Sequence, residues 1–482
     1  MVRPIRFAII GAGMAGILSA IKLDEAGHHD YTVYEKADRL GGTWRENTYP
    51  GIACDVPSHL YSYSFAPNPA WSHRYSPGDE IQAYFTRVAS EYGVDRRIRF
   101  DCGIERAEFL DGRWQLTTST GEHDVADVII AATGVLHHPN IATFAGIETF
   151  RGASFHSARW DNEVMLDGAR VGVVGTGSTA VQITAALVPR VASLTMFQRT
   201  PQWIAPQDNV AYTPHEIEQF GLHPETIVQL RAEISRSFAE NFSNAVVDAG
   251  SPQMQLIEAV CRGHLETVVN EELREKLRPD YRAACKRLVI SGDFYQAIQQ
   301  PNATLVTETI ERVEPTGVRT ADGRLHELDV LVLATGFRAD RFMRPIEVVG
   351  SDGVDLDQVW QHRPVAYLSI SVPGFPNLFM LNGPNGPVGN FSLIEVAELQ
   401  IQYVLSLVEE IRRGRCAQIS ASAEATRAFD EERVEAAKKT VWATGCRSWY
   451  LDDRGIPAAW PWTFDRFRDE MAAPKLHDFV TA

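Results

Sequence analysis

The stretch Ile5-Arg-Phe-Ala-Ile-Ile10-Gly11-Ala-Gly13-Met-Ala-Gly16 decides the fold of this chain of 482 residues. Residues 5–10 have the pattern of a buried strand, residues 11–16 turn the chain, and residues 17–26 continue with helical periodicity. A second strand is predicted at Tyr31 to Glu35. Both strands should lie parallel in one sheet, because such crossovers are almost always right-handed. We therefore expect a β-α-β unit here.

The same order of elements recurs in the middle of the chain. A strand at Arg170 to Val174 runs into Gly175-Thr-Gly177-Ser-Thr-Ala180, and a helical segment and a strand at Ser193 to Phe197 follow. Two apolar strands that end in a Thr-Gly turn, residues 127–134 and 329–336, are expected to close the two units. The predicted fold class is α/β, with two Rossmann-like dinucleotide-binding domains.

Each glycine fingerprint is expected to hold a pyrophosphate. The glycines allow a tight turn and close approach of the phosphates to a helix amino terminus. Glu35 follows Gly11 by 24 residues, where its carboxylate can accept hydrogen bonds from a ribose diol. Arg199 stands at the same offset from Gly175, where a cation suits a ribose with a 2′-phosphate. We expect NADPH at the second site and a dinucleotide without that phosphate at the first. The alternative for the first site is a glycine turn that binds no nucleotide. The alternative for the second is that Arg199 is a solvated surface residue.

Composition and charge exclude several classes of function. The net charge of −16 disfavours nucleic acid as a partner, because the chain would repel phosphate backbones. No apolar run reaches the roughly 18 to 20 residues of a membrane-spanning helix, and the strand at Ile5 leaves no room for a signal peptide. The cysteines form no C-x-x-C pair and have no zinc-ligand spacing, so we expect reduced thiols, no metal site and a cytoplasmic location. They are Cys54, Cys102, Cys261, Cys285, Cys416 and Cys446.

Two longer motifs point to a family. Phe150-Arg-Gly-Ala-Ser-Phe-His156-Ser-Ala-Arg-Trp160-Asp161 resembles the signature F-x-G-x-x-x-H-x-x-x-W-[PD] of type I Baeyer–Villiger monooxygenases. Related flavin monooxygenases usually carry Tyr or Phe where Trp160 stands. Residues 41–55 match a second family pattern, [AG]-G-x-W-x-x-x-x-[FY]-P-[GM]-x-x-x-D. The resemblance implies that the first motif links the nucleotide domains. Whether His156 acts directly or only structurally stays open.

The resemblance implies the cofactors FAD and NADPH and a Baeyer–Villiger oxidation. In that reaction NADPH reduces FAD, O₂ adds to give a flavin peroxide, and the peroxide attacks a ketone to yield an ester or lactone. A cation is needed where negative charge accumulates. Arg287, in Cys285-Lys-Arg-Leu288, matches the family's Lys-Arg segment and is the expected catalytic cation. Asp55 is expected to hold it by an ion pair. Without the resemblance, the Lys-Arg pair would be solvated surface and Asp55 a turn residue.

The same comparison implies the cofactor contacts. Lys286 is expected to reach the 2′-phosphate together with Arg199 and Thr200, and Trp442 to lie against the nicotinamide. The expected FAD contacts are Gly11, Gly13, Gly16, Glu35, Gly42, Thr43, Trp44, Asp55 and Tyr61. The expected NADPH contacts are Gly175, Thr176, Gly177, Ser178, Thr179, Arg199, Thr200, Lys286 and Trp442.

The expected domains follow from these sites and from a change of pattern. Residues 206–282 read as charged, amphipathic helices, which indicates a helical insertion in the second domain. The FAD-binding domain is expected to be discontinuous, with residues 1–138 and 330–482. The NADPH-binding domain should comprise residues 139–205 and 283–329. The substrate pocket is expected between the insertion and the loops around Phe337, residues 382–390 and Trp442.

Three other functions compete with ketone oxidation. A flavin monooxygenase that oxidises sulfur or nitrogen would use the same cofactors, and protonation in the active site would decide between the two reactions. A disulfide reductase would need a cysteine pair beside the flavin, and Cys54 has no partner nearby in the sequence. A non-catalytic nucleotide-binding protein would leave Arg287 and Asp55 without a role. The expected partners are a small ketone and O₂, in a monomer or small homo-oligomer; the sequence does not identify the ketone.

Overall fold

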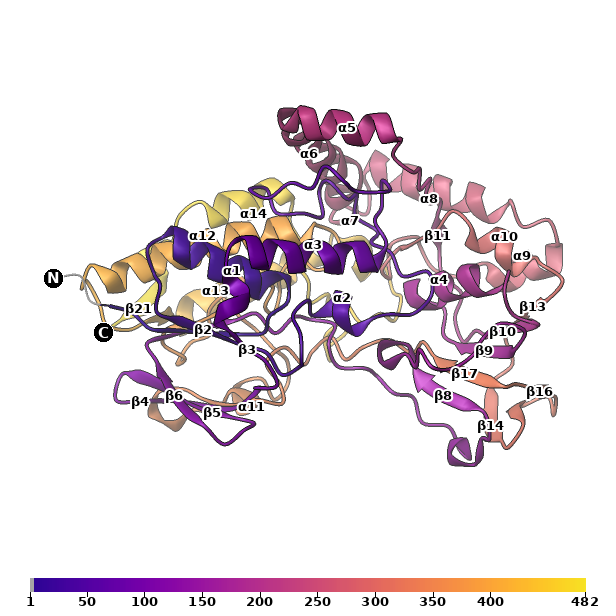
Figure 1. Ribbon diagram of the computed structural model, residues 1–482, viewed down its shortest axis with the longest axis horizontal. Coiled ribbons are helices and arrows are strands. Elements are labelled where there is room, and N and C mark those ends of the chain that lie inside the picture. The colour runs from indigo at the N-terminus through magenta and orange to yellow at the C-terminus, as the bar shows by residue number, and fades with distance from the viewer. Residues whose placement is uncertain (1–3) are drawn as a thin grey trace.

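The first domain of the computed structural model, which describes residues 4–482, is built on a five-stranded parallel sheet (Figure 1). The strand order is β19 (Leu378–Met380), β7 (Val128–Ala131), β1 (Phe7–Ile10), β2 (Tyr31–Tyr34) and β3 (Ile98–Arg99). Helix α1 (Met14–Glu25) connects β1 to β2, which pair in parallel with Phe7 opposite Tyr31. The predicted β-α-β unit is confirmed.

Both faces of this sheet are covered, as is usual for parallel sheets. Phe7 and Ile9 are fully buried on the face that packs against α1, α3 (Gly78–Glu91) and α12 (Leu393–Arg412). Ala8 and Ile10 point the other way, because successive side chains of a strand alternate between faces. They pack against a four-stranded sheet. Its strands are β18 (Glu347–Val349), β4 (Ile104–Leu110), β5 (Arg113–Thr118) and β6 (His123–Ala126).

The second domain repeats this plan. Its parallel sheet has the order β13 (Ala303–Val306), β10 (Ser193–Phe197), β9 (Arg170–Val174), β17 (Val330–Leu333) and β8 (Ala153–His156). Helices α4 (Ser178–Leu187) and α10 (Phe294–Ile298) cover one face. The antiparallel strands β14 (Ile310–Glu314), β15 (Gly317–Thr320) and β16 (Leu325–Glu327) cover the other. The prediction of an α/β protein with two Rossmann-like domains is therefore confirmed.

Strand β17 corrects the expected boundary at residue 330. It pairs in parallel with β9 and with β8, so residues 330–333 belong to the second sheet and not to the first. The chain returns to the first domain only afterwards. The returning segment runs beside the segment that first leaves this domain. Pro139 and Phe337 form a β-bridge, and the Asn140 amide donates to the Gly336 carbonyl at 2.8 Å. The two connections between the domains thus form one paired ribbon.

Residues 206–282 are helical, as predicted, and lie above the second domain in Figure 1. The helices are α5 (Pro214–Leu222), α6 (Pro224–Phe238), α7 (Asn244–Val246), α8 (Pro252–Leu265) and α9 (Glu271–Leu277). Arg231 of α6 reaches the first domain, where its Nη1 donates to the carbonyls of Leu60 at 2.9 Å and Ser62 at 2.6 Å. It also pairs with Glu398 of α12 at 3.5 Å. The insertion therefore bridges both domains.

The C-terminal part corrects a second expectation. Helices α13 (Ala423–Ala437) and α14 (Phe464–Met471) pack on the first domain, but Trp442, Cys446 and Tyr450 between them pack in the core of the second. Cys446 forms a disulfide with Cys285, so the expectation of six reduced thiols is wrong for this pair. Sequence spacing gave no hint, because 161 residues separate the two cysteines and only the fold brings them together.

Residues 4–482 contain neither a membrane-spanning helix nor a cluster of metal-ligand side chains. None of their helices has the length and apolar character needed to cross a membrane. Within the same residues, no three His, Cys, Asp or Glu side chains are grouped so that they could hold a metal ion.

Candidate functional site

The first fingerprint forms a tight turn that only glycine fits. Gly11 has a φ of +103°, and a Cβ there would lie 2.6 Å from the Ala132 carbonyl oxygen at the end of β7. A Cβ on Gly16 would lie 1.8 Å from the Gly11 carbonyl oxygen, which holds α1 against the turn. Gly13 lies against Gly42 of the second motif, and the amino end of α1 has no side-chain cap. The backbone amides of α1 are therefore available to an anion such as a pyrophosphate.

Glu35 is placed beside this turn, as its offset predicted. It is 4% exposed, and its carboxylate accepts hydrogen bonds from the Ala12 amide at 2.8 Å and the Ala37 amide at 3.1 Å. Arg45, in the middle of α2 (Thr43–Glu46), donates to the same carboxylate at 2.9 Å. The sequence did not single out Arg45, because it occupies an unspecified position of the second motif. These contacts hold the Glu35 carboxylate in a fixed orientation next to the fingerprint.

The second fingerprint has the same geometry. Gly175 has a φ of +132°, and its Cβ would lie 2.2 Å from the Ala334 carbonyl oxygen at the end of β17. Gly177 faces open space, and the amino end of α4 has no side-chain cap. Ser178 and Thr179 are the first residues of α4, and the Thr176 hydroxyl donates to the Thr200 carbonyl at 2.8 Å. Like the first turn, this one presents unpaired amides to a phosphate.

Arg199 and Lys286 gather beside the second fingerprint. Arg199 is exposed and pairs with no carboxylate among residues 4–482. Burial lowers the pKa of Lys286; the Asp280 charge opposes this shift, and the nearby Arg199 charge adds to it. The Lys286 ammonium also lies 4.3 Å from the centre of the Tyr281 ring. Two cations that repel each other at one place form a site for a group with negative charge.

Arg287 and Asp55 form an ion pair across the two domains. Arg287 lies just before β12 (Val289–Ile290), which pairs with β11 (Ile204–Ala205), whereas Asp55 follows the second motif in the first domain. The Asp55 charge raises the pKa of Arg287, and the guanidinium also donates to the Gly389 carbonyl at 3.4 Å. Both side chains keep some surface, with 33% of Arg287 and 26% of Asp55 exposed. The structure thus joins the two residues that the sequence proposed as catalytic.

Aromatic residues flank this ion pair on the first domain. The Trp44 indole donates to the Tyr61 hydroxyl at 3.1 Å, and their rings meet edge to face at 5.6 Å. Burial raises the pKa of Tyr61, and the Asp55 and Arg287 charges are near enough to act on it. Trp44, Tyr61 and the neighbouring Thr43 all keep exposed surface. They can therefore meet a planar ligand next to Arg287.

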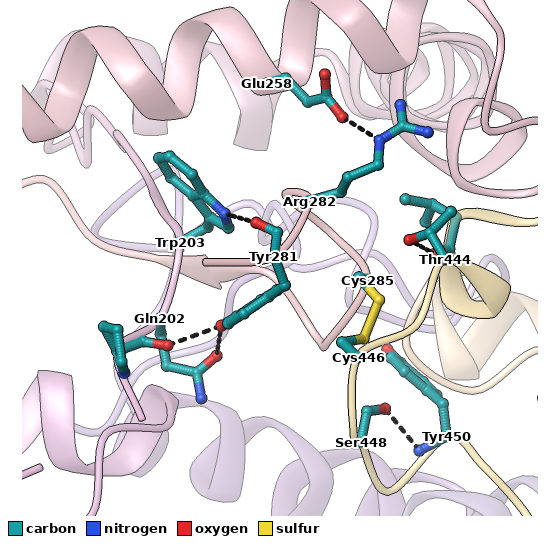
Figure 2. The surroundings of a disulfide bond; sticks show 12 residues. Gln202, Trp203, Glu258, Tyr281, Arg282, Cys285, Thr444, Cys446, Ser448 and Tyr450 are labelled. Atoms are coloured by element: carbon teal, nitrogen blue, oxygen red, sulfur yellow. Dashed lines mark hydrogen bonds and ion pairs between the residues drawn. A yellow bond between two sulfur atoms is a disulfide. The ribbon is translucent and has the colours of Figure 1, made fainter. Parts of the chain in front are cut away.

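Trp442, the expected nicotinamide contact, is buried. It is 2% exposed and packs against Tyr450, with ring centres 5.1 Å apart, in the core of the second domain. The side chain therefore offers little free surface to a ligand in this structure. Tyr450, which the sequence did not single out, lies close to Arg287. Figure 2 shows Tyr450 near the disulfide.

His156 has a structural environment. It is 4% exposed; its Nδ1 accepts a hydrogen bond from the Ala158 amide at 3.1 Å, and its Nε2 lies 3.1 Å from the Gly336 carbonyl oxygen, to which it donates. Burial lowers its pKa, which favours the neutral ring that these bonds require. His156 therefore ties the Phe150 to Asp161 segment to the ribbon between the domains.

A cavity of about 560 Å³ lies next to Trp44. It is lined by three segments of the first domain, residues 39–53, 73–75 and 77–82, and by Asn209 at the start of the insertion. Phe337, residues 382–390 and Trp442, which were expected around the substrate pocket, do not line it.

Comparison with known proteins gives consistent results. Residues 5–346 match a family model described as flavin-binding monooxygenase-like. An uncharacterized monooxygenase of Mycobacterium tuberculosis is 46% identical over 96% of this chain and 94% of its own length. A Baeyer–Villiger monooxygenase of Streptomyces coelicolor is 37% identical over 98% of this chain and 92% of its own. The crystal structure of cyclohexanone monooxygenase from Rhodococcus sp. Phi1 bound to NADP⁺ superposes with a TM-score of 0.89, at 29% identity and with 99% of each chain covered.

Proposed function

Because the chain belongs to the flavin-binding monooxygenase-like family and, within it, to the type I Baeyer–Villiger monooxygenases, we propose that it converts a ketone into an ester or lactone. The overall reaction is ketone, O₂, NADPH and a proton to ester, NADP⁺ and water. The observation that carries this proposal is the Arg287–Asp55 pair, which places a permanent cation beside Trp44 and Tyr61.

The first site fits FAD. The matching family binds flavin, and the fold around Gly11 and Glu35 is that of a dinucleotide site, so the flavin should be the adenine dinucleotide. The open amide end of α1 would hold the pyrophosphate, and Glu35 would accept hydrogen bonds from the ribose. The partly exposed Thr43, Trp44 and Tyr61 would meet the ring system. When bound, NADPH and FAD supply the reducing equivalents and the activation of O₂.

The residues of this chain then control charge and position. Arg287 stays ionised at any working pH, and its donors are directed at one place. Negative charge accumulates on the carbonyl oxygen when a ketone is attacked, and a fixed guanidinium stabilises that charge more than it stabilises the neutral substrate. Asp55 limits where the guanidinium can point. These roles favour reaction at carbonyl groups over reaction at soft sulfur or nitrogen.

The reaction type is tested by product analysis. We expect the purified, FAD-loaded protein with NADPH and O₂ to form esters or lactones from members of a panel of cyclic, linear and aryl ketones. Gas chromatography coupled to mass spectrometry would detect products heavier than the ketone by one oxygen atom. Thioethers and tertiary amines form the second arm of the panel. Products from that arm alone would replace this proposal with heteroatom oxidation.

Cofactor preference is tested at Arg199 and Lys286. We propose that these cations bind the 2′-phosphate, so kcat/KM should be higher for NADPH than for NADH. Arg199→Ala should reduce kcat/KM for NADPH by roughly 10- to 100-fold, the value of one charge-assisted hydrogen bond, and leave that for NADH nearly unchanged. Arg190→Ala is the control, because this exposed arginine of the same domain pairs only with Asp167. Equal efficiency of the two cofactors in the unmodified protein would overturn the assignment.

A further inference from the structure

Arg287 has a third neighbour besides Asp55 and the Gly389 carbonyl. The Tyr450 hydroxyl lies close enough to the guanidinium to affect its pKa. Tyr450 is 3% exposed and its ring packs at a tilt against two tryptophans, with ring centres 5.1 Å from Trp442 and 4.3 Å from Trp449. The phenol therefore cannot easily turn away from Arg287.

Gly389 makes room for this contact. Its φ is +96°, and a Cβ there would lie 2.1 Å from the Tyr450 hydroxyl oxygen. The phenol thus lies directly on the backbone of Gly389, whose carbonyl accepts a hydrogen bond from Arg287 at 3.4 Å. Gly389 and Tyr450, which are distant in sequence, thus both lie next to the Arg287 guanidinium.

The disulfide connects the segments that carry Arg287 and Tyr450. Cys285 precedes Arg287 by two residues and Cys446 precedes Tyr450 by four, and Figure 2 shows the two segments joined through the sulfur atoms. Cys285 is fully buried and Cys446 is 7% exposed. In the same view, the Tyr450 amide donates to the Ser448 hydroxyl at 3.0 Å.

The segment of Cys285 is itself fixed to its surroundings. Figure 2 shows Arg282 paired with Glu258 of α8 at 2.7 Å, and the Tyr281 hydroxyl bonded to Gln202 at 2.8 Å. The Cys446 segment, in contrast, lies in a stretch between α13 and α14 that has only the short 3₁₀ turn Val441–Ala443. The disulfide to the fixed Cys285 segment therefore restricts the motion of this irregular segment more than it would restrict a helix or strand.

We propose that Tyr450 is a positioning residue for Arg287. We also propose that the Cys285–Cys446 disulfide keeps the Tyr450 and Arg287 side chains next to each other. The inference rests on the proposed function for its kinetic readout only. An arginine side chain has many rotamers, and each contact that selects one of them increases the fraction of turnovers in which the charge is correctly placed. Loss of Tyr450 removes one contact and leaves the charge.

The first test is Tyr450→Phe. We expect the yield of oxygenated product per NADPH to fall about 5- to 10-fold, as for the loss of one polar contact, with a matching rise in hydrogen peroxide. The rate of flavin reduction by NADPH should stay within about twofold of that of the unmodified protein. A general structural defect would instead lower both flavin reduction and product yield. Tyr295→Phe is the control, since the buried Tyr295 hydroxyl has no hydrogen-bond partner among residues 4–482. An unchanged product yield in Tyr450→Phe would overturn the positioning role.

The second test needs no turnover. Peptide mapping without reductant should find the Cys285 and Cys446 peptides joined in the purified protein. In Cys446→Ser, trypsin should cut after the exposed Arg447 at least about 10-fold faster than in the unmodified chain, because tethered segments open less often. Cys416→Ser is the control, since Cys416 is unpaired and partly exposed. Free thiols at both positions, or equal cleavage rates, would overturn the tether.

These outcomes remain separate from those of the proposed function. If the unmodified protein oxygenates thioethers alone, the proposed function fails, yet the product yield of Tyr450→Phe can still be measured with a thioether. If the unmodified protein makes esters and Tyr450→Phe does so with the same yield, only the positioning role fails. Proteolysis and peptide mapping answer the question of the tether in either case.

Discussion

Replacement of Arg287 with alanine is expected to abolish ester formation while NADPH still reduces the flavin. The second fingerprint, Arg199 and Lys286 are unchanged in this variant, so the reductive half-reaction keeps its binding site. Oxygen transfer loses the cation that stabilises negative charge on the carbonyl oxygen. Removal of one such group lowers rates by roughly 100- to 1000-fold in well-studied enzymes. Stopped-flow absorbance of the flavin measures the first step, and ester per NADPH measures the second.

Two further variants make this result specific. Arg287→Lys keeps a positive charge but loses the planar set of donors, so it should recover part of the ester yield and not all of it. Arg278→Ala should behave like the unmodified protein, because this arginine, nine residues earlier, forms ion pairs only with Glu266 and Glu275. Undiminished ester formation by Arg287→Ala would remove Arg287 from the catalytic site.

Gly16→Ala is expected to prevent formation of a stable, flavin-loaded protein. The new Cβ would lie 1.8 Å from the Gly11 carbonyl oxygen, a backbone atom that cannot move aside without pulling α1 away from the turn. Overpacked cores typically cost about 1–3 kcal/mol, and this backbone collision should exceed that range. Net stabilities are only about 5–15 kcal/mol, so most of the soluble protein should be lost. Soluble yield, flavin absorbance and Tm measure the effect.

Gly263→Ala is the matched control for this variant. Gly263 also lies inside a helix, α8, but a Cβ there meets nothing within 4 Å. Alanine is a better helix former than glycine by about 1 kcal/mol, so Tm should stay the same or rise slightly. If Gly16→Ala kept its flavin and its Tm, the close packing of the first fingerprint would not be required.

Local patterns were sufficient to predict the fold of both domains. The strand at residues 5–10, its glycine turn and the following helix obey short-range rules, and the same rules apply at residues 170–188. Glu35 and Arg199 were also found by offset, because the length of a β-α-β unit determines where its second strand ends. Arg287 and Asp55 could be brought together only by the family resemblance, since 232 residues separate them.

The errors concern contacts that no local rule determines. The boundary at residue 330 fell before β17 instead of after it, because only strand pairing shows which sheet a strand joins. The Cys285–Cys446 bond was missed because pairing depends on how the C-terminal segment folds back over the second domain. The burial of Trp442 was not predicted, because an aromatic residue has the same sequence signal whether it lies in a core or against a ligand.

The paired ribbon between the domains holds their mutual orientation together with the helical insertion and the Arg287–Asp55 pair. The backbones of residues 138–140 and 336–338 bond to each other. The Gly336 carbonyl also accepts a hydrogen bond from His156, at the end of β8, so the stretch Phe150 to Asp161 is attached to this ribbon. We expect substitutions in that stretch to change the relative orientation of the domains more than the reactivity of the oxygenating centre.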